Sequence, residues 1–297
     1  MSIIQIIAPT SSASGPFLDA YATGVFSVYG LNLLLSAYGT GPAINVRRSS
    51  DNTTQDIHFL STGALDTVSL LAFCGSGNGF VTIWYDQTGN GNHIANSTTT
   101  LQPQVVNAGV YSGFIVFDGV DDALVCVNTN GSPAACSVYW GGTLRSTARQ
   151  IIACSDNTDS GGPTSTSGVM TVAYENTFNG TQNKLFTSNY SNGVSNEATG
   201  VTITNNVLTY CTNFFGSTNA TRNNIYSAGT LVSPSYSNAG TIPTSTTLFA
   251  SNWTVGCATE ASILRPAAIS LKNFVIYNVY HSSTDVTNVE TVLHHYV

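Results

Sequence analysis

The feature that most constrains this chain is a succession of short β-prone runs separated by glycine, asparagine, aspartate and serine. Valine, isoleucine, tyrosine, phenylalanine and threonine are frequent in these runs, and such residues fit a pleated, half-buried surface. Many short strands at this spacing, with little helix between them, are typical of an antiparallel sandwich. We predict strands at residues 43–47, 79–85, 114–117, 137–140, 169–174, 207–215, 246–251 and 269–277.

Two segments depart from this pattern and are predicted to be helical. Apolar residues are frequent over residues 17–36, although Gly24 and Gly30 weaken a helix there. Near the end of the chain, residues 283–285 supply an N-cap, and apolar residues then recur at helical spacing over residues 286–293. The second segment is predicted to be a short C-terminal helix.

The chain contains no repeat and no long linker, so we predict one domain over residues 17–297. Residues 1–16 join an apolar stretch to a segment rich in proline, serine and glycine, which is typical of a flexible joint. This segment is predicted to be either an N-terminal arm that docks onto a partner or an edge strand of the same domain. It lacks the features of a secretory signal peptide, so none is predicted.

The charge of the chain and the length of its apolar runs exclude two classes of partner. The chain has 8 Lys and Arg residues against 15 Asp and Glu residues, a net charge of −7, and no basic run beyond Arg47-Arg48. Binding of nucleic acid through counterion release requires a larger basic surface. No apolar run approaches the roughly 20 residues of a membrane-spanning helix. Neither nucleic acid nor a membrane is therefore predicted as a partner.

The metal-binding and redox signals are weak. Six scattered cysteines without a C-x-x-C pair disfavour zinc and are best interpreted as small buried hydrophobic residues. Cys126 and Cys136 could instead close a hairpin as a disulfide in an oxidising environment. Asp118, Asp121 and Asp122 could hold Ca²⁺, but their spacing is not that of an EF-hand. We predict no metal and no cofactor, with Ca²⁺ at this turn as the alternative.

A tight turn is predicted after the strand at residues 79–85. The carboxylate of Asp86 can accept amide hydrogen bonds there, and Asn90 and Gly91 tolerate the left-handed conformations that a turn requires. These residues are predicted to be structural. The alternative is that Asp86 and His93 take part in catalysis.

Three stretches resemble known families. Residues 47–93, which end in Tyr-Asp-Gln-Thr-Gly-Asn-Gly-Asn-His, look like the N-terminal part of the arabinofuranosidase B catalytic domain. Residues 117–124, with Asp118 and Gly119 at the turn, resemble the strand-turn-strand signature of LamG-like domains. Residues 274–278 and the following helix are similar to the end of the same domains. The resemblance implies an all-β, antiparallel, concanavalin A-like jelly-roll β-sandwich, and the combination is also similar to structural proteins of tailed bacteriophages.

The resemblance also implies catalytic positions. Residues 172–180 resemble the family's nucleophile strand, which makes Glu175 the nucleophile position. A retaining glycosidase needs a second carboxyl group about 5–5.5 Å away, but the segment similar to the family's acid/base position holds Ser251 and Asn252. Loss of a general acid typically costs roughly 10²- to 10⁴-fold in rate. Glu260 is close in sequence, but no pattern places it opposite Glu175, so hydrolysis is not expected.

We therefore predict a non-enzymatic structural protein on the virion surface of a tailed phage, in the capsid, the tail or a fibre. Other virion subunits and further copies of the chain, for example in a trimer, are the predicted partners. A host glycan is a candidate ligand, and Tyr174, Glu175, Asn176 and Trp253 are the candidate sugar-facing residues. Core packing is the alternative for the aromatic residues. The alternative function is a retaining glycoside hydrolase similar to α-L-arabinofuranosidase.

Overall fold

The structure is a computed structural model of the chain. It describes residues 17–127, 136–146, 150–155, 169–175, 184–191, 194–202, 208–214, 223–227, 230–232, 235–238, 252–257 and 266–297. The predicted N-terminal arm or edge strand at residues 1–16 and the predicted strand at residues 246–251 lie outside the described residues. Both therefore stay predictions.

Within the described ranges, nineteen strands form one continuous hydrogen-bonded system, and paired strands run antiparallel. The first half of the chain supplies β1 (Val25–Gly30), β2 (Pro42–Arg48), β3 (Thr54–His58), β4 (Gly79–Trp84), β5 (Ile94–Ala95), β6 (Gln104–Asn107), β7 (Val110–Asp118), β8 (Leu124–Val127) and β9 (Cys136–Leu144). The second half supplies β10 (Gln150–Ser155), β11 (Val169–Glu175), β12 (Lys184–Ser191), β13 (Val194–Thr202), β14 (Leu208–Phe214), β15 (Asn223–Ser227), β16 (Thr230–Val232), β17 (Ser235–Asn238), β18 (Asn252–Val255) and β19 (Ala268–Tyr277). The predicted all-β sandwich is confirmed.

Short helices connect some of these strands. The 3₁₀ helices are η1 (Leu18–Tyr21), η2 (Ser36–Tyr38) and η3 (Thr99–Leu101), and the α-helices are α1 (Thr67–Cys74) and α3 (Ser283–His294). No helix in the described part of the chain is long and apolar enough to span a membrane.

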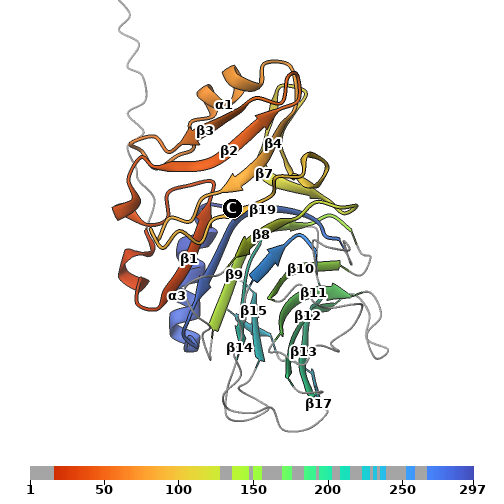
Figure 1. Ribbon diagram of the computed structural model, residues 1–297. Coiled ribbons are helices and arrows are strands. Elements are labelled where there is room, and N and C mark those ends of the chain that lie inside the picture. The colour runs from red at the N-terminus through yellow and green to blue at the C-terminus, as the bar shows by residue number, and fades with distance from the viewer. Residues whose placement is uncertain are drawn as a thin grey trace, which may run out of the picture.

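Strand β19 joins the two parts of the molecule. Figure 1 shows β2, β3, β4 and α1 gathered at one end, the strands from β9 to β17 at the other, and β19 running between them. Along one edge β19 pairs with β7 over residues 268–271 and with β1 over residues 273–277, and along the other it pairs with β9. The fully buried rings of Tyr29, Trp140 and Phe274 lie on β1, β9 and β19, respectively. Each contributes roughly 1.5–3 kcal/mol through burial.

The helix predicted over residues 17–36 is wrong, because β1 occupies the middle of this segment. Gly24, directly before β1, has a φ of +76°, a left-handed conformation that turns the chain into the strand. Val28 and Tyr29, adjacent in β1, are both fully buried but belong to different hydrophobic clusters. A strand buried on both faces shows no apolar–polar alternation, so its pattern resembled that of a helix.

The predicted C-terminal helix is confirmed as α3, although its N-cap is Ser282, one residue before the predicted segment. The Ser282 side chain accepts from the backbone N–H of Asp285, and the Asp285 carboxylate accepts from the N–H of Ser282, which forms a capping box. The buried face of α3 belongs to the same hydrophobic cluster as residues of β1, β9 and β19, namely Val28, Tyr139, Val275 and Tyr277. The sequence analysis missed α1, whose N-cap Asp66 accepts from the N–H of Ser69 at 3.0 Å.

The disulfide considered for Cys126 and Cys136 does not form, and both side chains are buried. Burial raises the pKa of Cys126 to about 12, and burial also raises that of Cys136 well above its usual value. Both therefore act as the small buried hydrophobic residues that the simpler interpretation predicted.

Candidate functional site

The turn after β4 is organised by the buried carboxylate of Asp86. Its Oδ1 accepts from the backbone N–H groups of Val28, at 2.9 Å, and Thr88, at 3.1 Å. Its Oδ2 accepts from the Thr88 hydroxyl at 2.6 Å and from the Asn92 N–H at 3.3 Å. Because Asp86 is fully buried and its two oxygens hold these four bonds, the carboxylate fixes the turn and is not available to a substrate.

His93 closes the same turn. Its Nδ1 accepts from the backbone N–H of Asp86 at 3.0 Å, and its ring meets that of Tyr85 edge-on at 4.9 Å. Between Asp86 and His93, Gly91 has a φ of +76°, while the Asn90 side chain donates to the Phe26 carbonyl at 3.2 Å. These contacts fix the shape of the turn.

Gln87 ties this turn to the segment before η2. Its Oε1 accepts from the backbone N–H of Leu34 at 2.7 Å and of Leu35 at 3.3 Å, and its Nε2 donates to the Asn32 carbonyl at 3.0 Å. Gln87 is 3% exposed, so these bonds form in a water-poor environment. The turn and η2 are therefore held at a fixed separation.

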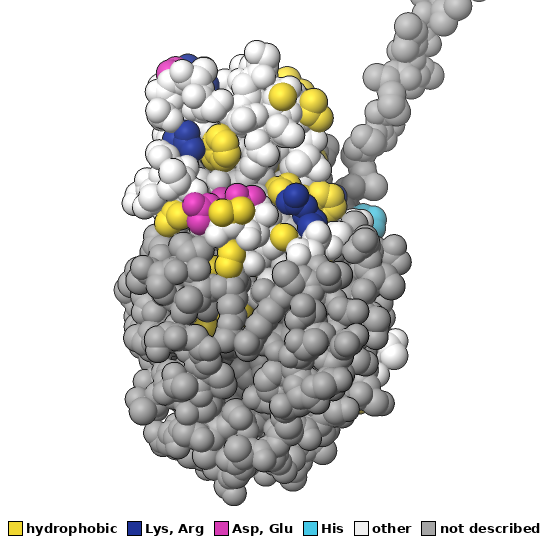
Figure 2. Space-filling view, turned by 90° about the vertical axis from the view of Figure 1, so that its right-hand side faces the viewer, with side chains coloured by type: hydrophobic (Ala, Val, Ile, Leu, Met, Phe, Trp, Pro, Cys, Tyr) yellow, Lys and Arg dark blue, Asp and Glu magenta, His cyan; other side chains and the backbone are white. Residues whose placement is uncertain are grey.

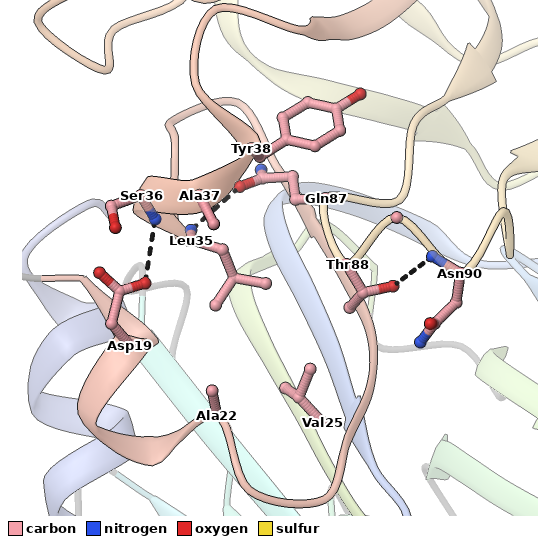
Figure 3. Close-up of a pocket in the computed structure, with 11 residues that line it drawn as sticks. Asp19, Ala22, Val25, Leu35, Ser36, Ala37, Tyr38, Gln87, Thr88 and Asn90 are labelled. Atoms are coloured by element: carbon pink, nitrogen blue, oxygen red, sulfur yellow. Dashed lines mark hydrogen bonds between the residues drawn. The ribbon is translucent and has the colours of Figure 1, made fainter.

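This separation leaves a pocket of about 610 Å³ between η1, η2 and the turn, shown in Figure 3. Its apolar lining comes from Ala22, Val25, Leu35 and Ala37, and its polar lining from Asp19, Ser36, Tyr38, Gln87, Thr88, Gly89 and Asn90. Asp19 supplies the only carboxylate of this lining, so the pocket does not contain the two carboxyl groups that glycoside hydrolysis uses. The sequence analysis missed this pocket, because its walls come from segments about 50 residues apart.

The second predicted turn carries a cluster of three carboxylates. Asp118 Oδ1 accepts from the backbone N–H of Val120 at 2.7 Å, and Asp122 Oδ2 accepts from the N–H of Asp118 at 2.8 Å. Gly119 has a φ of +84°, and a Cβ there would lie 2.7 Å from the Cβ of Ala268. This glycine is therefore required by the turn and by the close approach of β19.

One oxygen from each of Asp118, Asp121 and Asp122 lies within 4.8 Å of the others, an oxygen set that suits Ca²⁺. Burial raises the pKa of Asp122 to about 7, and the neighbouring carboxylates of Asp118 and Asp121 add to this effect. On the face shown in Figure 2, the Lys and Arg side chains of the described residues lie apart from one another. The described part of this face therefore carries no continuous basic patch.

The predicted nucleophile position, Glu175, is the last residue of β11 and pairs with Lys184 of β12. Its neighbour Tyr174 pairs with Gln150 of β10. The structure describes the backbone of β11 but not its side chains, and the predicted residues Asn176 and Ser251 lie outside the described residues. The roles assigned to these residues stay predictions.

The strand register separates Glu175 from the predicted acid/base position. Strand β10 lies between β11 and β18, and its Cys154 pairs with Thr171 on one side and with Thr254 on the other. Because β11 and β18 are both antiparallel to β10, they run in the same direction. Glu175 lies four residues beyond Thr171 and Asn252 two residues before Thr254, which at about 3.3 Å per residue places them about 20 Å apart along the sheet.

The absence of a carboxylate at Ser251 and Asn252 therefore does not decide whether Glu175 has an acid partner. The end of β18 that lies level with Glu175 is its C-terminal end, where Gly256 donates to the Ile152 carbonyl of β10 at 2.9 Å. Residues 258–265, which lie outside the described residues, follow this end, and Glu260 is their only carboxylate.

Trp253, a candidate sugar-facing residue, is only 1% exposed. Its ring lies 5.5 Å from that of Phe26, within the main hydrophobic core. The burial agrees with the alternative of core packing, and Trp253 presents no ring face to a ligand.

The comparisons with known proteins concern mainly the first third of the chain. The family described as the catalytic domain of α-L-arabinofuranosidase B matches residues 17–113. An α-L-arabinofuranosidase of Hypocrea jecorina is 38% identical over 106 residues, which cover 33% of this chain and 21% of that protein. An arabinofuranosidase/B-xylosidase of Trichoderma koningii is 40% identical over 103 residues, which cover 32% of this chain and 20% of that protein. The match thus spans about a fifth of these relatives.

Solved structures extend the likeness in fold over most of the chain. An arabinofuranosidase complexed with arabinofuranosyl-α-1,2-xylobiose matches with a TM-score of 0.61 at 16% identity, covering 94% of this chain and 64% of that one. A GH54 α-L-arabinofuranosidase soaked with a cyclic sulfate inhibitor matches with a TM-score of 0.59 over the same shares.

These findings correct the predicted function. The prediction of a non-enzymatic phage structural protein is wrong, because the matched relatives are fungal arabinofuranosidases and not virion components. The predicted virion partners and the location on a phage particle are wrong for the same reason. Over residues 17–113 the chain is similar in sequence to the catalytic domain of α-L-arabinofuranosidase B, and over 94% of its length it has the fold of an arabinofuranosidase.

Proposed function

We propose that this chain is a glycoside hydrolase of the α-L-arabinofuranosidase type. The observation that carries the proposal is the sequence similarity of residues 17–113 to the catalytic domain of arabinofuranosidase B. The fold shared over 94% of the chain supports it. Sequence similarity in a segment that contributes β1 to β6 indicates a common origin, whereas a shared fold alone does not determine function.

In the proposed reaction, the Glu175 carboxylate attacks the anomeric carbon of the arabinofuranosyl unit, and the bond to the leaving oxygen breaks. A second carboxylic acid protonates that oxygen, and a water molecule then hydrolyses the glycosyl–enzyme ester with the same group acting as base. The two carboxyl groups must lie about 5–5.5 Å apart. Glu175 ends β11, and residues after strand ends are well placed to contact a ligand.

We infer that Glu260 supplies the second carboxyl group. Both ends of the segment that carries it are anchored level with the C-terminal end of β11, because Gly256 bonds to Ile152 of β10 and the N–H of Ala267 bonds back to the Gly256 carbonyl at 2.7 Å. Glu260 is the only carboxylate in the eight-residue sequence 258–265 between these anchors. Asn252, by contrast, starts β18 at the opposite end of the sheet.

The test measures hydrolysis of 4-nitrophenyl α-L-arabinofuranoside by the full chain and by Glu175→Gln and Glu260→Gln, with Asp121→Asn as a carboxylate control outside the proposed site. We expect turnover by the parent protein and the control, and loss to background in Glu175→Gln. Glu260→Gln should lose roughly 10²- to 10⁴-fold in rate, and added azide should restore nitrophenol release from it with formation of α-L-arabinofuranosyl azide.

The configuration of the azide product separates the two roles. Azide that replaces water in the second step attacks the glycosyl–enzyme ester and gives the α-azide, whereas azide that replaces the nucleophile attacks the substrate directly and gives the β-azide. A parent protein that does not hydrolyse this substrate would contradict the proposed function. Full activity in Glu175→Gln would contradict the nucleophile assignment, and full activity in Glu260→Gln would contradict the acid/base assignment alone.

A further inference from the structure

The pocket between η1, η2 and the Asp86 turn lies apart from the proposed hydrolytic residues. Its lining residues are in segments 19–38 and 87–90, and none is in β10, β11 or β18. Figure 1 shows β1, which contributes Val25 to the pocket, at the left of the view and β11 at the right, with β9 between them. A ligand in this pocket would therefore not contact Glu175.

The pocket walls are rigid without a ligand. Gln87 binds two backbone N–H groups and one carbonyl of residues 32–35, and Asp86 holds the backbone of Val28 and Thr88. The Thr88 hydroxyl also accepts from the N–H of Asn90 at 3.1 Å. A preformed pocket loses little conformational entropy when a ligand binds.

The lining carries one carboxylate and no cationic side chain, which disfavours phosphates, sulfates and acidic sugars. Asp19 is exposed, and its Oδ1 accepts from the N–H of Ser36 at 3.0 Å. In Figure 3 its carboxylate lies beside Ser36 at the pocket rim, whereas the ring of Tyr38 points away from Ala22 and Val25. An ammonium group would therefore find no aromatic cage here.

We propose that this pocket binds one neutral sugar unit, as a carbohydrate site separate from the hydrolytic residues. The C–H face of a sugar ring packs against the apolar side chains of Val25 and Leu35. Its hydroxyl groups donate to the Asp19 carboxylate and bond to the hydroxyl and amide groups of Ser36 and Asn90. The pocket volume of about 610 Å³ lies within the range of roughly 300–1,000 Å³ that is usual for small-molecule sites.

The test is a titration of the ¹⁵N-labelled full chain with L-arabinose, D-xylose and D-galactose, followed through the backbone amide signals of Ser36, Thr88 and Asn90. D-Galacturonate serves as the charged counterpart of D-galactose. Ala22→Trp places a large ring in the pocket, and Ala20→Trp places the same ring two residues earlier, at an exposed residue of η1 that does not line the pocket.

We expect saturable shifts at these amides with at least one neutral sugar, loss of the shifts in Ala22→Trp and retention in Ala20→Trp. Asp19→Asn should weaken the binding about tenfold, because a neutral acceptor replaces a charged one. The absence of saturable shifts, shifts that persist in Ala22→Trp, or equal affinity for D-galacturonate and D-galactose would each overturn the proposal. The titration requires no turnover, so its result is independent of whether the chain hydrolyses arabinofuranosides.

Discussion

Asp122 makes the stability of this protein depend on pH in a direction that can be worked out from its environment. The residue is 7% exposed, and burial raises the pKa of its carboxyl group to about 7. The pKa of an aspartate in the unfolded chain is about 3.9. Between these values the folded state binds the proton more tightly than the unfolded state, so this group lowers the free energy of unfolding as the pH rises from about 4 to about 7.

The expected size of this loss follows from the pKa difference. About three pKa units correspond to ~4 kcal/mol, and solvent near the exposed Asp118 reduces this to about 2–4 kcal/mol. The substitution Asp122→Asn removes the charge but keeps an oxygen that can accept from the N–H of Asp118, now 2.8 Å away. We therefore expect Asp122→Asn to be about 2–4 kcal/mol more stable than the parent protein at pH 8, and this difference should fall to about 1 kcal/mol or less at pH 4.5.

Urea unfolding, followed by tryptophan fluorescence at pH 4.5, 6, 7 and 8, measures this difference. Asp121→Asn is the control, because Asp121 belongs to the same cluster but is not buried; its effect should be smaller at every pH. A difference between Asp122→Asn and the parent protein that does not change with pH would refute the reasoning. Millimolar CaCl₂ should leave the midpoint unchanged, because Asp118 and Asp122 already bind backbone N–H groups of their own turn.

Three further substitutions test the fold by the same urea assay. Asp86→Ala should cost about 4 kcal/mol or more, because it leaves several buried donors unpaired at roughly 1–3 kcal/mol each; a cost below 1 kcal/mol would contradict the structural role of this carboxylate. Gly256→Ala should lower the free energy of unfolding by more than about 2 kcal/mol. The φ of Gly256 is +100°, and the added Cβ would meet the Phe117 ring and lie 2.6 Å from the Asp122 carbonyl oxygen. An unchanged midpoint would refute this expectation. Burial lowers the pKa of His281, whose Nδ1 bonds to the Tyr139 hydroxyl at 2.6 Å. The stability that neutral His281 contributes is therefore present above about pH 6.5 and is lost as the pH falls. His281→Gln should flatten the acid side of the stability profile, and an unchanged slope there would count against this account.

The strand pattern and the turns were predictable because their signals are local. Apolar and β-branched runs bounded by turn residues predicted the positions of β2, β4, β11, β14 and β19 closely, and they predicted about half of β7 and β9. Asp86 and Asp118 could be recognised as turn residues, because an aspartate followed by glycine or asparagine can bind nearby backbone N–H groups. The C-terminal helix carried both a cap and a 3.6-residue period, and each of these signals is complete within twelve residues.

The sequence was less informative where the outcome depended on distant partners. Residues 17–36 have a helix-like apolar content, but pairing with β19, about 250 residues later, makes their middle a strand. The exposure of Trp253 could not be read from an aromatic residue in a β-prone run, since both burial and glycan stacking suit such a residue. The relation between Glu175 and Asn252 was equally hidden, because only the register through β10 shows that they lie at different ends of the sheet.

The sequence by itself thus determined the class of fold, the C-terminal helix and the chemistry of the two aspartate turns, because backbone propensity and hydrogen bonding within a few residues decide these features. The tertiary structure alone decided which strand ends meet, which aromatic residues are buried and where a pocket forms. These outcomes depend on contacts between segments tens to hundreds of residues apart, and Asp122 is an example: its carboxyl group has a pKa of about 7 only because the folded chain removes it from water.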